Sequence, residues 1–282
     1  MQGGGENGGQ DRRPRASELH KRILSSLVLV PAAGLLIATG GPVFEAGILA
    51  IAMLMAWEWG KLLAPERHRT TVRAFIAVAA VSTVLMVHLV GLAFAVIWAA
   101  VIPFLSIVVS HQIKLRAPVW LGAAVTGTVF PVLSLLWMRN HLDFGLETVV
   151  YVVASVVLTD IGAYAAGRSI GGPKLAPRVS PSKTWAGLAG GIAGALAVAA
   201  VFAEFHEQAR LLVLAPLAFA IALVAQAGDL IESAAKRRFK VKDSGTLIPG
   251  HGGILDRVDG QVTVIPVIAL AMAVTGRSVL QW

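Results

Sequence analysis

The sequence alternates between long apolar stretches and short polar segments. A helix that crosses a bilayer needs about 20 predominantly apolar residues, and nine stretches come close to that length. They cover residues 22–39, 42–62, 72–89, 91–109, 119–138, 147–166, 185–204, 211–231 and 261–277. We therefore predict an all-α, polytopic membrane protein with about nine transmembrane helices. The tightest predicted connection is a hairpin that turns at Gly91.

The composition agrees with this pattern and narrows the chemistry. Hydrophobic residues make up 56% of the chain and charged residues 14%, whereas soluble domains carry about 25% charged residues. The chain has no cysteine, which excludes disulfides and thiolate chemistry. Asp, Glu and His remain as metal ligands, and this set favours a hard cation such as Mg²⁺ over structural zinc.

The positive charges predict an orientation. With nine spans, Lys and Arg gather on one side of the membrane, and only Arg139, Arg210 and Arg277 fall on the other. An excess of Lys and Arg marks cytoplasmic segments, so we expect a cytoplasmic N-terminus. The segments 167–184 and 232–260 then face the cytoplasm together. We divide the chain into a disordered cytoplasmic tail (1–21), N-terminal transmembrane helices (22–138) and a C-terminal transmembrane catalytic region (139–282).

The most polar segment, residues 226–260, lies between two predicted spans. Its first part continues a helical pattern that places Asp229, Ser233, Lys236 and Lys240 on one face. We expect the helix to break near Gly245. Charge beside apolar helices is costly unless it is paired or bound to a metal.

A glycine-rich stretch around His251 follows, and then Asp256 and Asp259, three residues apart. Carboxylates hold Mg²⁺, while cationic side chains and backbone N–H groups bind phosphate oxygens. The segment therefore favours a phosphate ligand that carries a metal. A polybasic loop on anionic lipid is the alternative for the basic run alone. For His251, the roles of base, phosphate donor and loop hydrogen bonder stay open.

A second polar cluster occupies residues 159–191. Asp160 is an ionisable group within an apolar run, which makes it a functional candidate, although pairing with a neighbouring helix is the alternative. Ser180, Lys183 and Thr184 precede a span, where hydroxyls, an ammonium and free N–H groups can bind an anion. An N-cap with a snorkelling lysine is the simpler reading of the same residues. The glycines and prolines between the spans exclude a long helix.

Glu58 lies near the cytoplasmic end of the second predicted span, between Trp57 and Trp59. The two tryptophans are typical of a belt at the membrane interface. Glu58 could reach a Lys or Arg partner, and a catalytic role is the less favoured alternative.

The run S-A-A-K-R-R-F-K-V-K-D-S-G-T-L-I-P-G-H-G-G-I-L-D-R-V-D from Ser233 to Asp259 resembles the signature of phosphatidate cytidylyltransferases. The preceding G-D-L-I-E-S and the upstream D-I-G-A-Y-A-A-G-R and K-L-A-P-R-V-S-P-S-K-T-W are also similar to that family. The resemblance is dense over residues 159–260 and general before residue 150. Ala186 stands where the family commonly has an acidic residue, so one carboxylate is missing from the second cluster.

The resemblance implies transfer of the CMP moiety of CTP to phosphatidic acid, giving CDP-diacylglycerol and pyrophosphate for phospholipid biosynthesis. It also implies Mg²⁺, with a second cation left open. We assign catalytic roles to Asp229, Asp256, Lys236, Asp243 and His251. Substrate binding is assigned to Ser180, Lys183, Thr184, Ser233, Arg237, Lys242, Arg257 and Asp160. The predicted metal ligands are Asp229, Asp256 and Asp259.

The expected partners are CTP, phosphatidic acid and the lipid bilayer, without nucleic acid, and a homodimer is left open. The expected location is a bacterial-type inner membrane with the active site facing the cytoplasm. A transferase or kinase with another nucleotide or lipid acceptor is the alternative function. A secondary transporter is disfavoured, since transporter sites lie near the midplane of the membrane.

Overall fold

The structure is a computed structural model, and it describes residues 15–115, 118–141, 143–241, 243–245, 247 and 252–282. Most of this part of the chain is helical. The elements in chain order are α1 (Arg15–Thr39), α2 (Gly41–Leu63), α3 (Glu66–Leu89), α4 (Leu92–Gln112), α5 (Pro118–His141), α6 (Gly145–Ser169), β1 (Lys174–Ala176), β2 (Ser180–Thr184), α7 (Trp185–Phe205), α8 (Leu211–Arg238), α9 (Leu255–Thr275) and a 3₁₀ turn, η1 (Val279–Gln281).

The helices confirm the predicted all-α membrane architecture. Eight of the described helices, α2 to α9, are long and apolar enough to cross a membrane. The described apolar segment of α1, Leu27–Thr39, is shorter than these eight helices. The predicted hairpin at Gly91 is also confirmed, because α3 ends at Leu89 and α4 begins at Leu92, and Gly91 has a φ of 103°. This left-handed backbone is readily adopted by glycine.

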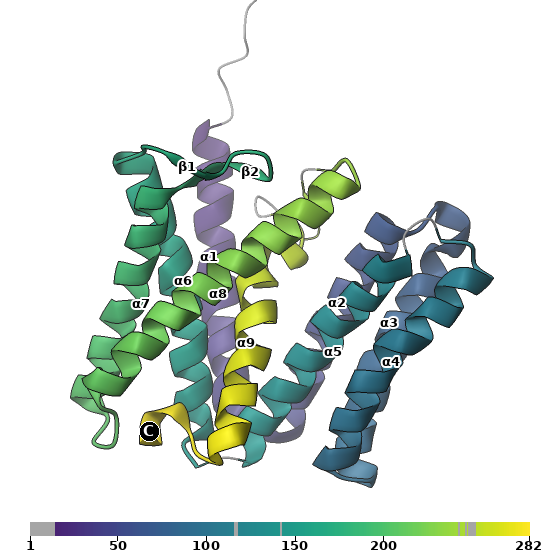
Figure 1. Cartoon of the computed structure of the whole chain (residues 1–282), viewed down its shortest axis with the longest axis horizontal. Helices are drawn as coiled ribbons and strands as arrows, with labels where there is room; N and C mark the ends of the chain where they lie inside the picture. The colour runs from purple at the N-terminus through teal and green to yellow at the C-terminus, as the bar shows by residue number, and fades with distance from the viewer. Residues whose placement is uncertain (1–14, 116–117, 142, 242, 246, 248–251) are drawn as a thin grey trace, which may run out of the picture.

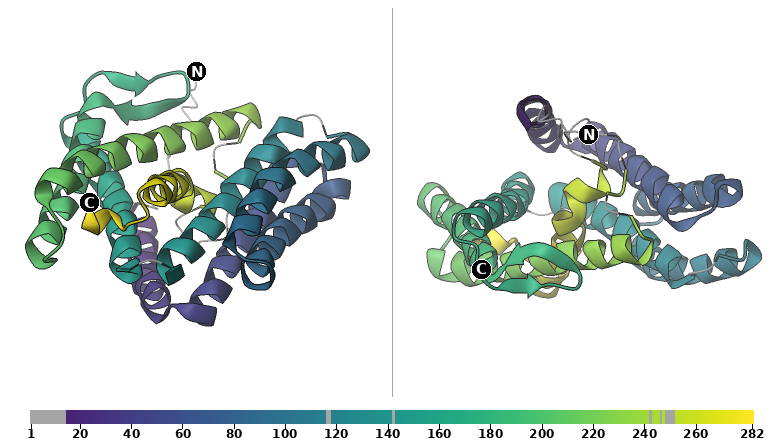
Figure 2. Two further views of the ribbon diagram at one scale, coloured as in Figure 1. Left: turned by 60° about the horizontal axis from the view of Figure 1, so that its bottom comes forward. Right: turned by 90° about the horizontal axis from the view of Figure 1, so that it is seen from above.

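The helices form two groups that meet along α5 and α9 (Figure 1). One group contains α2 to α5, and its buried core includes Ile76, Leu121 and Val129. The other contains α6 to α9, with a core that includes Tyr151 and Ile221. Further views show α8 crossing obliquely over this second group (Figure 2). The contact between α5 and α9 places the N-terminal helices beside the polar segment that begins α9.

Helices α6 and α7 pack backbone to backbone. A Cβ atom at Gly162 would lie 2.2 Å from the carbonyl oxygen of Gly190, and one at Gly194 would lie 2.2 Å from that of Leu158. Small residues allow membrane helices to approach this closely. The packing fixes α7, and therefore the hairpin that precedes it, against the helix that carries Asp160.

The connection between α6 and α7 contains a two-stranded antiparallel hairpin, β1–β2, in place of a helix. The sequence correctly excluded a long helix here but did not predict strands. The hairpin lies at the same end of the bundle as the end of α8 and the start of α9 (Figure 1). The described residues of segments 167–184 and 232–260 therefore lie at one end of the bundle, as expected, and the cytoplasmic orientation of that end stays a prediction.

We predict that Gly162→Ala destabilises the protein. Its new methyl group would collide with the backbone of α7, and overpacking of this kind costs about 1–3 kcal/mol. Thermal unfolding of the detergent-solubilised protein should show a lower midpoint. Gly34→Ala is the matched control, since a Cβ at Gly34 meets nothing within 4 Å. Equal midpoints for the two variants would contradict the proposed close packing.

Candidate active site

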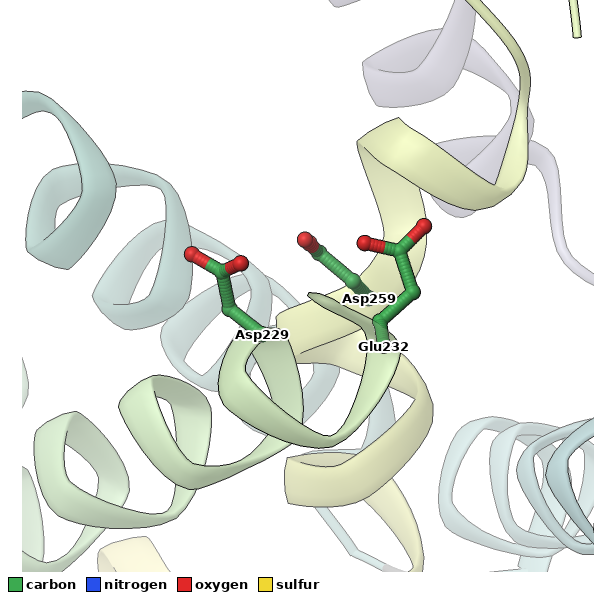
Figure 3. Close-up of side chains that lie close together, drawn as sticks. All are labelled: Asp229, Glu232 and Asp259. Carbon is green, nitrogen blue, oxygen red and sulfur yellow. The ribbon is translucent and has the colours of Figure 1, made fainter. Parts of the chain in front are cut away.

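Three carboxylates converge where α8 and α9 cross. Asp229 and Glu232 lie near the end of α8, and Asp259 lies in the second turn of α9. One oxygen from each residue lies within 4.8 Å of the other two. Figure 3 shows the three side chains grouped between the two helices. We call Asp229, Glu232 and Asp259 the acidic centre.

A glycine allows this convergence. A Cβ atom at Gly228 would lie 2.1 Å from Oγ1 of Thr263 and 3.0 Å from the carbonyl oxygen of Asp259. The two helices can therefore approach at this point only because Gly228 has no side chain. The residue that follows, Asp229, then comes close enough to Asp259 for the two charges to interact.

The second polar cluster reaches the acidic centre through Lys183. This lysine lies near the end of β2, and its ammonium forms an ion pair with Oδ2 of Asp229. Ser233 Oγ donates a long hydrogen bond of 3.5 Å to Oδ1 of the same carboxylate. The two polar segments that the sequence singled out thus form one site.

Lys236 joins the acidic centre to the start of α9. Its ammonium lies 2.7 Å from Oε2 of Glu232 and 2.8 Å from Oδ1 of Asp256. Asp256 also accepts hydrogen bonds from the backbone N–H groups of Ser244, at 3.1 Å, and Gly253, at 2.8 Å. The Asp256 carboxylate is therefore engaged by a lysine and two backbone amides.

The carboxylates that the structure groups together differ from the predicted metal ligands by one residue. Asp229 and Asp259 belong to the acidic centre. Asp256 is not part of this group and contacts Lys236, which in turn contacts Glu232. Glu232 was not among the predicted ligands, although its position three residues after Asp229 on the same helix was a usable signal. The roles of all four acids as metal ligands stay predictions.

Two other candidates lie within electrostatic reach of the site. Asp160 on α6 is close enough to interact with Asp229, Lys183 and Arg257. Asp160 and Arg257 are both exposed. Asp160 and Arg257 therefore add one negative and one positive charge near the acidic centre.

The remaining predicted residues have more local contacts. Ser180 Oγ lies 3.4 Å from Ser182 Oγ, and Arg237 Nε donates to the carbonyl oxygen of Val179 at 3.5 Å. Thr184 is the N-cap of α7 and accepts a hydrogen bond from the N–H of Gly187, which is the simpler reading given above.

The end of α8 also differs from the predicted pattern. Asp243 is exposed. Because α8 ends at Arg238, Lys240 does not extend the helix face that carries Asp229, and its φ is 57°. Lys242 and His251 lie outside the described residues, so their predicted roles stay predictions.

Glu58 corrects an expectation. It has no Lys or Arg partner in the described part of the chain. Its carboxylate instead accepts hydrogen bonds from Ser244 Oγ and from the backbone N–H groups of Ile254 and Leu255. The sequence could not reveal this contact, because 186 residues separate Glu58 from Ser244.

A cavity of about 490 Å³ lies beside the acidic centre, between α2, α5, α8 and α9. Its lining is largely apolar and includes Trp59, Trp120 and Phe130, with Glu232 and Asp259 as its acidic members. The site therefore places charged groups next to an apolar space of a size found for ligand pockets.

The acidic centre fits a hard divalent cation by its chemistry. It offers carboxylate oxygens from three side chains, which are the ligands preferred by Mg²⁺. Both oxygens of Glu232 are buried, and within the described residues neither accepts a hydrogen bond of good geometry, despite the nearby ammonium of Lys236. Buried oxygens of this kind are ready to coordinate a cation.

Fold and site together define a multi-pass helical membrane protein with an acidic, lysine-flanked site at one end of the bundle. The model of the cytidylyltransferase family matches residues 20–275. The chain belongs to this family.

Named relatives agree with this assignment. The chain is 38% identical to the phosphatidate cytidylyltransferase of Brucella suis biovar 1 (strain 1330) over 258 residues, which covers 92% of this chain and 94% of that protein. It is 35% identical to the phosphatidate cytidylyltransferase of Pseudomonas aeruginosa over 268 residues, covering 92% and 98%. A shorter match to the Bacillus subtilis protein of the same name is 42% identical over 138 residues, covering 48% and 51%.

We predict that Lys236→Met destabilises the protein. The change leaves the largely buried carboxylates of Glu232 and Asp256 without their shared cation, and loss of one member of such an ion pair costs about 3 kcal/mol. The thermal midpoint in detergent should fall. Lys240→Met is the control, since Lys240 is exposed just beyond α8. If the two substitutions have the same effect, Lys236 does not hold these carboxylates together.

Proposed function

We propose that this protein is a phosphatidate cytidylyltransferase, which transfers the CMP moiety of CTP to phosphatidic acid and releases pyrophosphate. The observation that carries the proposal is the acidic centre, flanked by Lys183 and Lys236 and adjoining an apolar cavity in a membrane bundle. The similarity to phosphatidate cytidylyltransferases over 92% of the chain supports the same activity. The product, CDP-diacylglycerol, serves phospholipid biosynthesis.

The reaction needs positioning and charge neutralisation more than an activated side chain. An ionised phosphate oxygen of phosphatidate forms a bond to the α-phosphorus of CTP. The bond from that phosphorus to the oxygen that bridges to the β-phosphate breaks, and pyrophosphate leaves with the bonding electrons. The site must therefore hold two anions together in line.

The lysines of this site suit that task. Lys183 and Lys236 each lie against a carboxylate of the acidic centre, so their positions are fixed before substrate binds. Fixed ammonium groups stabilise the charge that develops on the transferring and leaving phosphates without reorganising. Arg257, which lies within electrostatic reach of Asp160, adds a further cation at the rim of the site.

Asp229, Glu232 and Asp259 are the residues that would hold Mg²⁺. When bound there, the ion supplies neutralisation of the phosphate oxygens. In this arrangement Asp256 holds Lys236 in place through its 2.8 Å contact. Whether Asp256 also becomes a ligand is a prediction from sequence, as is a second cation.

The apolar cavity supports the proposal that the acceptor substrate is a lipid. Its aromatic and aliphatic lining lies directly beside Glu232 and Asp259. A diacylglycerol tail can remain in apolar surroundings while its phosphate reaches the acidic centre. The matched bacterial relatives favour an inner-membrane location. A homodimer stays a prediction from sequence.

The test is an assay of purified protein in detergent with labelled CTP and phosphatidic acid. We expect formation of labelled lipid and of pyrophosphate that depends on both substrates and stops when EDTA is added. Transfer of only the γ-phosphate would instead identify a lipid kinase. Solute uptake into liposomes without nucleotide consumption would identify a transporter.

We predict that Asp229→Asn and Asp256→Asn each abolish labelled-lipid formation. The first change removes a charge from the acidic centre, and the second removes the anchor of Lys236; loss of one electrostatic group costs about 10²–10³ in kcat. Both variants should elute as folded protein in size-exclusion chromatography. Asp143→Asn, in the exposed turn before α6, is the control. Near wild-type turnover in either site variant would count against the assignment.

We also predict that the site faces the cytoplasm. The chain contains no cysteine, so single cysteines report their own position. Arg178→Cys, in the hairpin beside the site, and Glu207→Cys, beyond the other end of α7, are both exposed positions. In intact cells an impermeant maleimide should label the cysteine at 207 and spare the cysteine at 178. The reverse pattern would invert the proposed orientation.

A further inference from the structure

Glu58 is the one Asp or Glu in the described part of the chain that is fully buried, with 1% of its surface exposed. It lies near the end of α2, in the N-terminal group of helices. A buried carboxylate is costly unless donors satisfy its charge. The donors that surround Glu58 all come from the segment 244–255, which belongs to the active site.

The carboxylate receives three hydrogen bonds. Ser244 Oγ donates to Oε2 at 2.9 Å, the N–H of Ile254 to Oε1 at 2.8 Å, and the N–H of Leu255 to Oε2 at 2.9 Å. Ile254 is the N-cap of α9 and Leu255 is its first residue, a position where N–H groups lack partners within the helix and favour negative charge. Glu58 therefore caps α9 from another helix.

The glycines of this segment are shaped by the same carboxylate. A Cβ atom at Gly245 would lie 2.5 Å from Oε1 of Glu58, and the other atoms it would meet most closely also belong to Glu58. A Cβ atom at Gly253 would lie 2.5 Å from both Glu58 oxygens. Gly245 and Gly253 thus both lie against Glu58, and Gly253 belongs to the glycine-rich stretch that the sequence associated with a phosphate.

From Glu58 a continuous set of contacts leads to the acidic centre. Ser244 binds Glu58 through its hydroxyl and Asp256 through its N–H, at 3.1 Å. Asp256 in turn contacts Lys236, and Lys236 contacts Glu232. The position of the lysine therefore depends on where Glu58 holds the loop.

We propose that Glu58 is a positioning residue for the transfer reaction, which fixes Ser244, Ile254 and Leu255 in the connection between α8 and α9 so that Asp256 holds Lys236 beside the acidic centre. The proposal rests on the proposed function. Glu58 does not touch the acidic centre itself, so it acts through Ser244 and Asp256. A small misplacement of a positioned group lowers turnover by about 10²-fold.

The experiment compares Glu58→Ala and Glu58→Gln in the full-length protein, with kcat and the KM for CTP measured separately. We expect Glu58→Ala to lower kcat about 100-fold while KM changes little, since the loop is displaced but Lys183 keeps its ion pair. Glu58→Gln retains one acceptor oxygen and should recover part of the loss. Glu45→Ala is the control, because Glu45 lies on the same helix and instead contacts His88.

Gly245→Ala tests the contact without removing a charge. In the wild-type background its methyl group should push against Glu58 and lower kcat about tenfold. In the Glu58→Ala background the methyl group has room, so Gly245→Ala should cause no further loss. An equal loss in both backgrounds would overturn the proposed contact. If Glu58→Ala folds poorly, Gly245→Ala in the wild-type background still tests the contact, because an unchanged kcat in that variant would overturn the proposal.

Hydrogen–deuterium exchange supplies a readout that does not depend on turnover. The peptide that contains Ile254 and Leu255 should exchange faster in Glu58→Ala than in Glu45→Ala. Faster exchange with unchanged kcat would overturn the proposal and leave Glu58 as a structural cap. Unchanged exchange would also overturn it. If the wild-type protein itself transfers no CMP, the proposed function fails, while the exchange data still report whether Glu58 fixes the loop.

Discussion

The crossing of α8 and α9 at Gly228 is the constraint on which the site depends. It brings Asp229, Glu232 and Asp259 together at the end of an otherwise apolar bundle. Three carboxylates so close repel one another, and ammonium groups offset part of this repulsion. Lys183 belongs to strand β2 of the hairpin, and Lys236 belongs to α8. The arrangement therefore favours additional positive charge, which is the reason for proposing a divalent cation at this site.

Little water reaches the apolar part of a membrane protein, and this explains the hydrogen bonds around the site. Polar backbone groups near the apolar region need partners within the protein. Glu58 meets this need for the start of α9, and Asp256 does so for Ser244 and Gly253. The contacts of Glu58 also connect the two groups of helices. The N-terminal helices thus contribute to the site, although the family signature lies in the C-terminal half.

The substrates explain why such a site stands beside an apolar cavity. A nucleotide is soluble, and a phosphatidate is anchored by its acyl chains. A centre at one end of the bundle can receive the first from water and the second from the bilayer. The lysines already held by carboxylates limit the reorganisation needed when the two phosphates meet. The cavity lined by Trp59 and Phe130 adjoins Glu232 and Asp259, so an apolar space lies directly beside the charged groups.

Local patterns in the sequence determined the helices, the turn at Gly91, the shared end of the two polar segments and the family. They do so because apolar length, charge bias and a dense motif are properties of neighbouring residues. Only the tertiary structure decided which acids meet. It grouped Glu232 with Asp229 and Asp259, set Asp256 against Lys236, and gave Glu58 its backbone partners. Those contacts depend on how helices distant in sequence cross, and no local pattern encodes the crossing point.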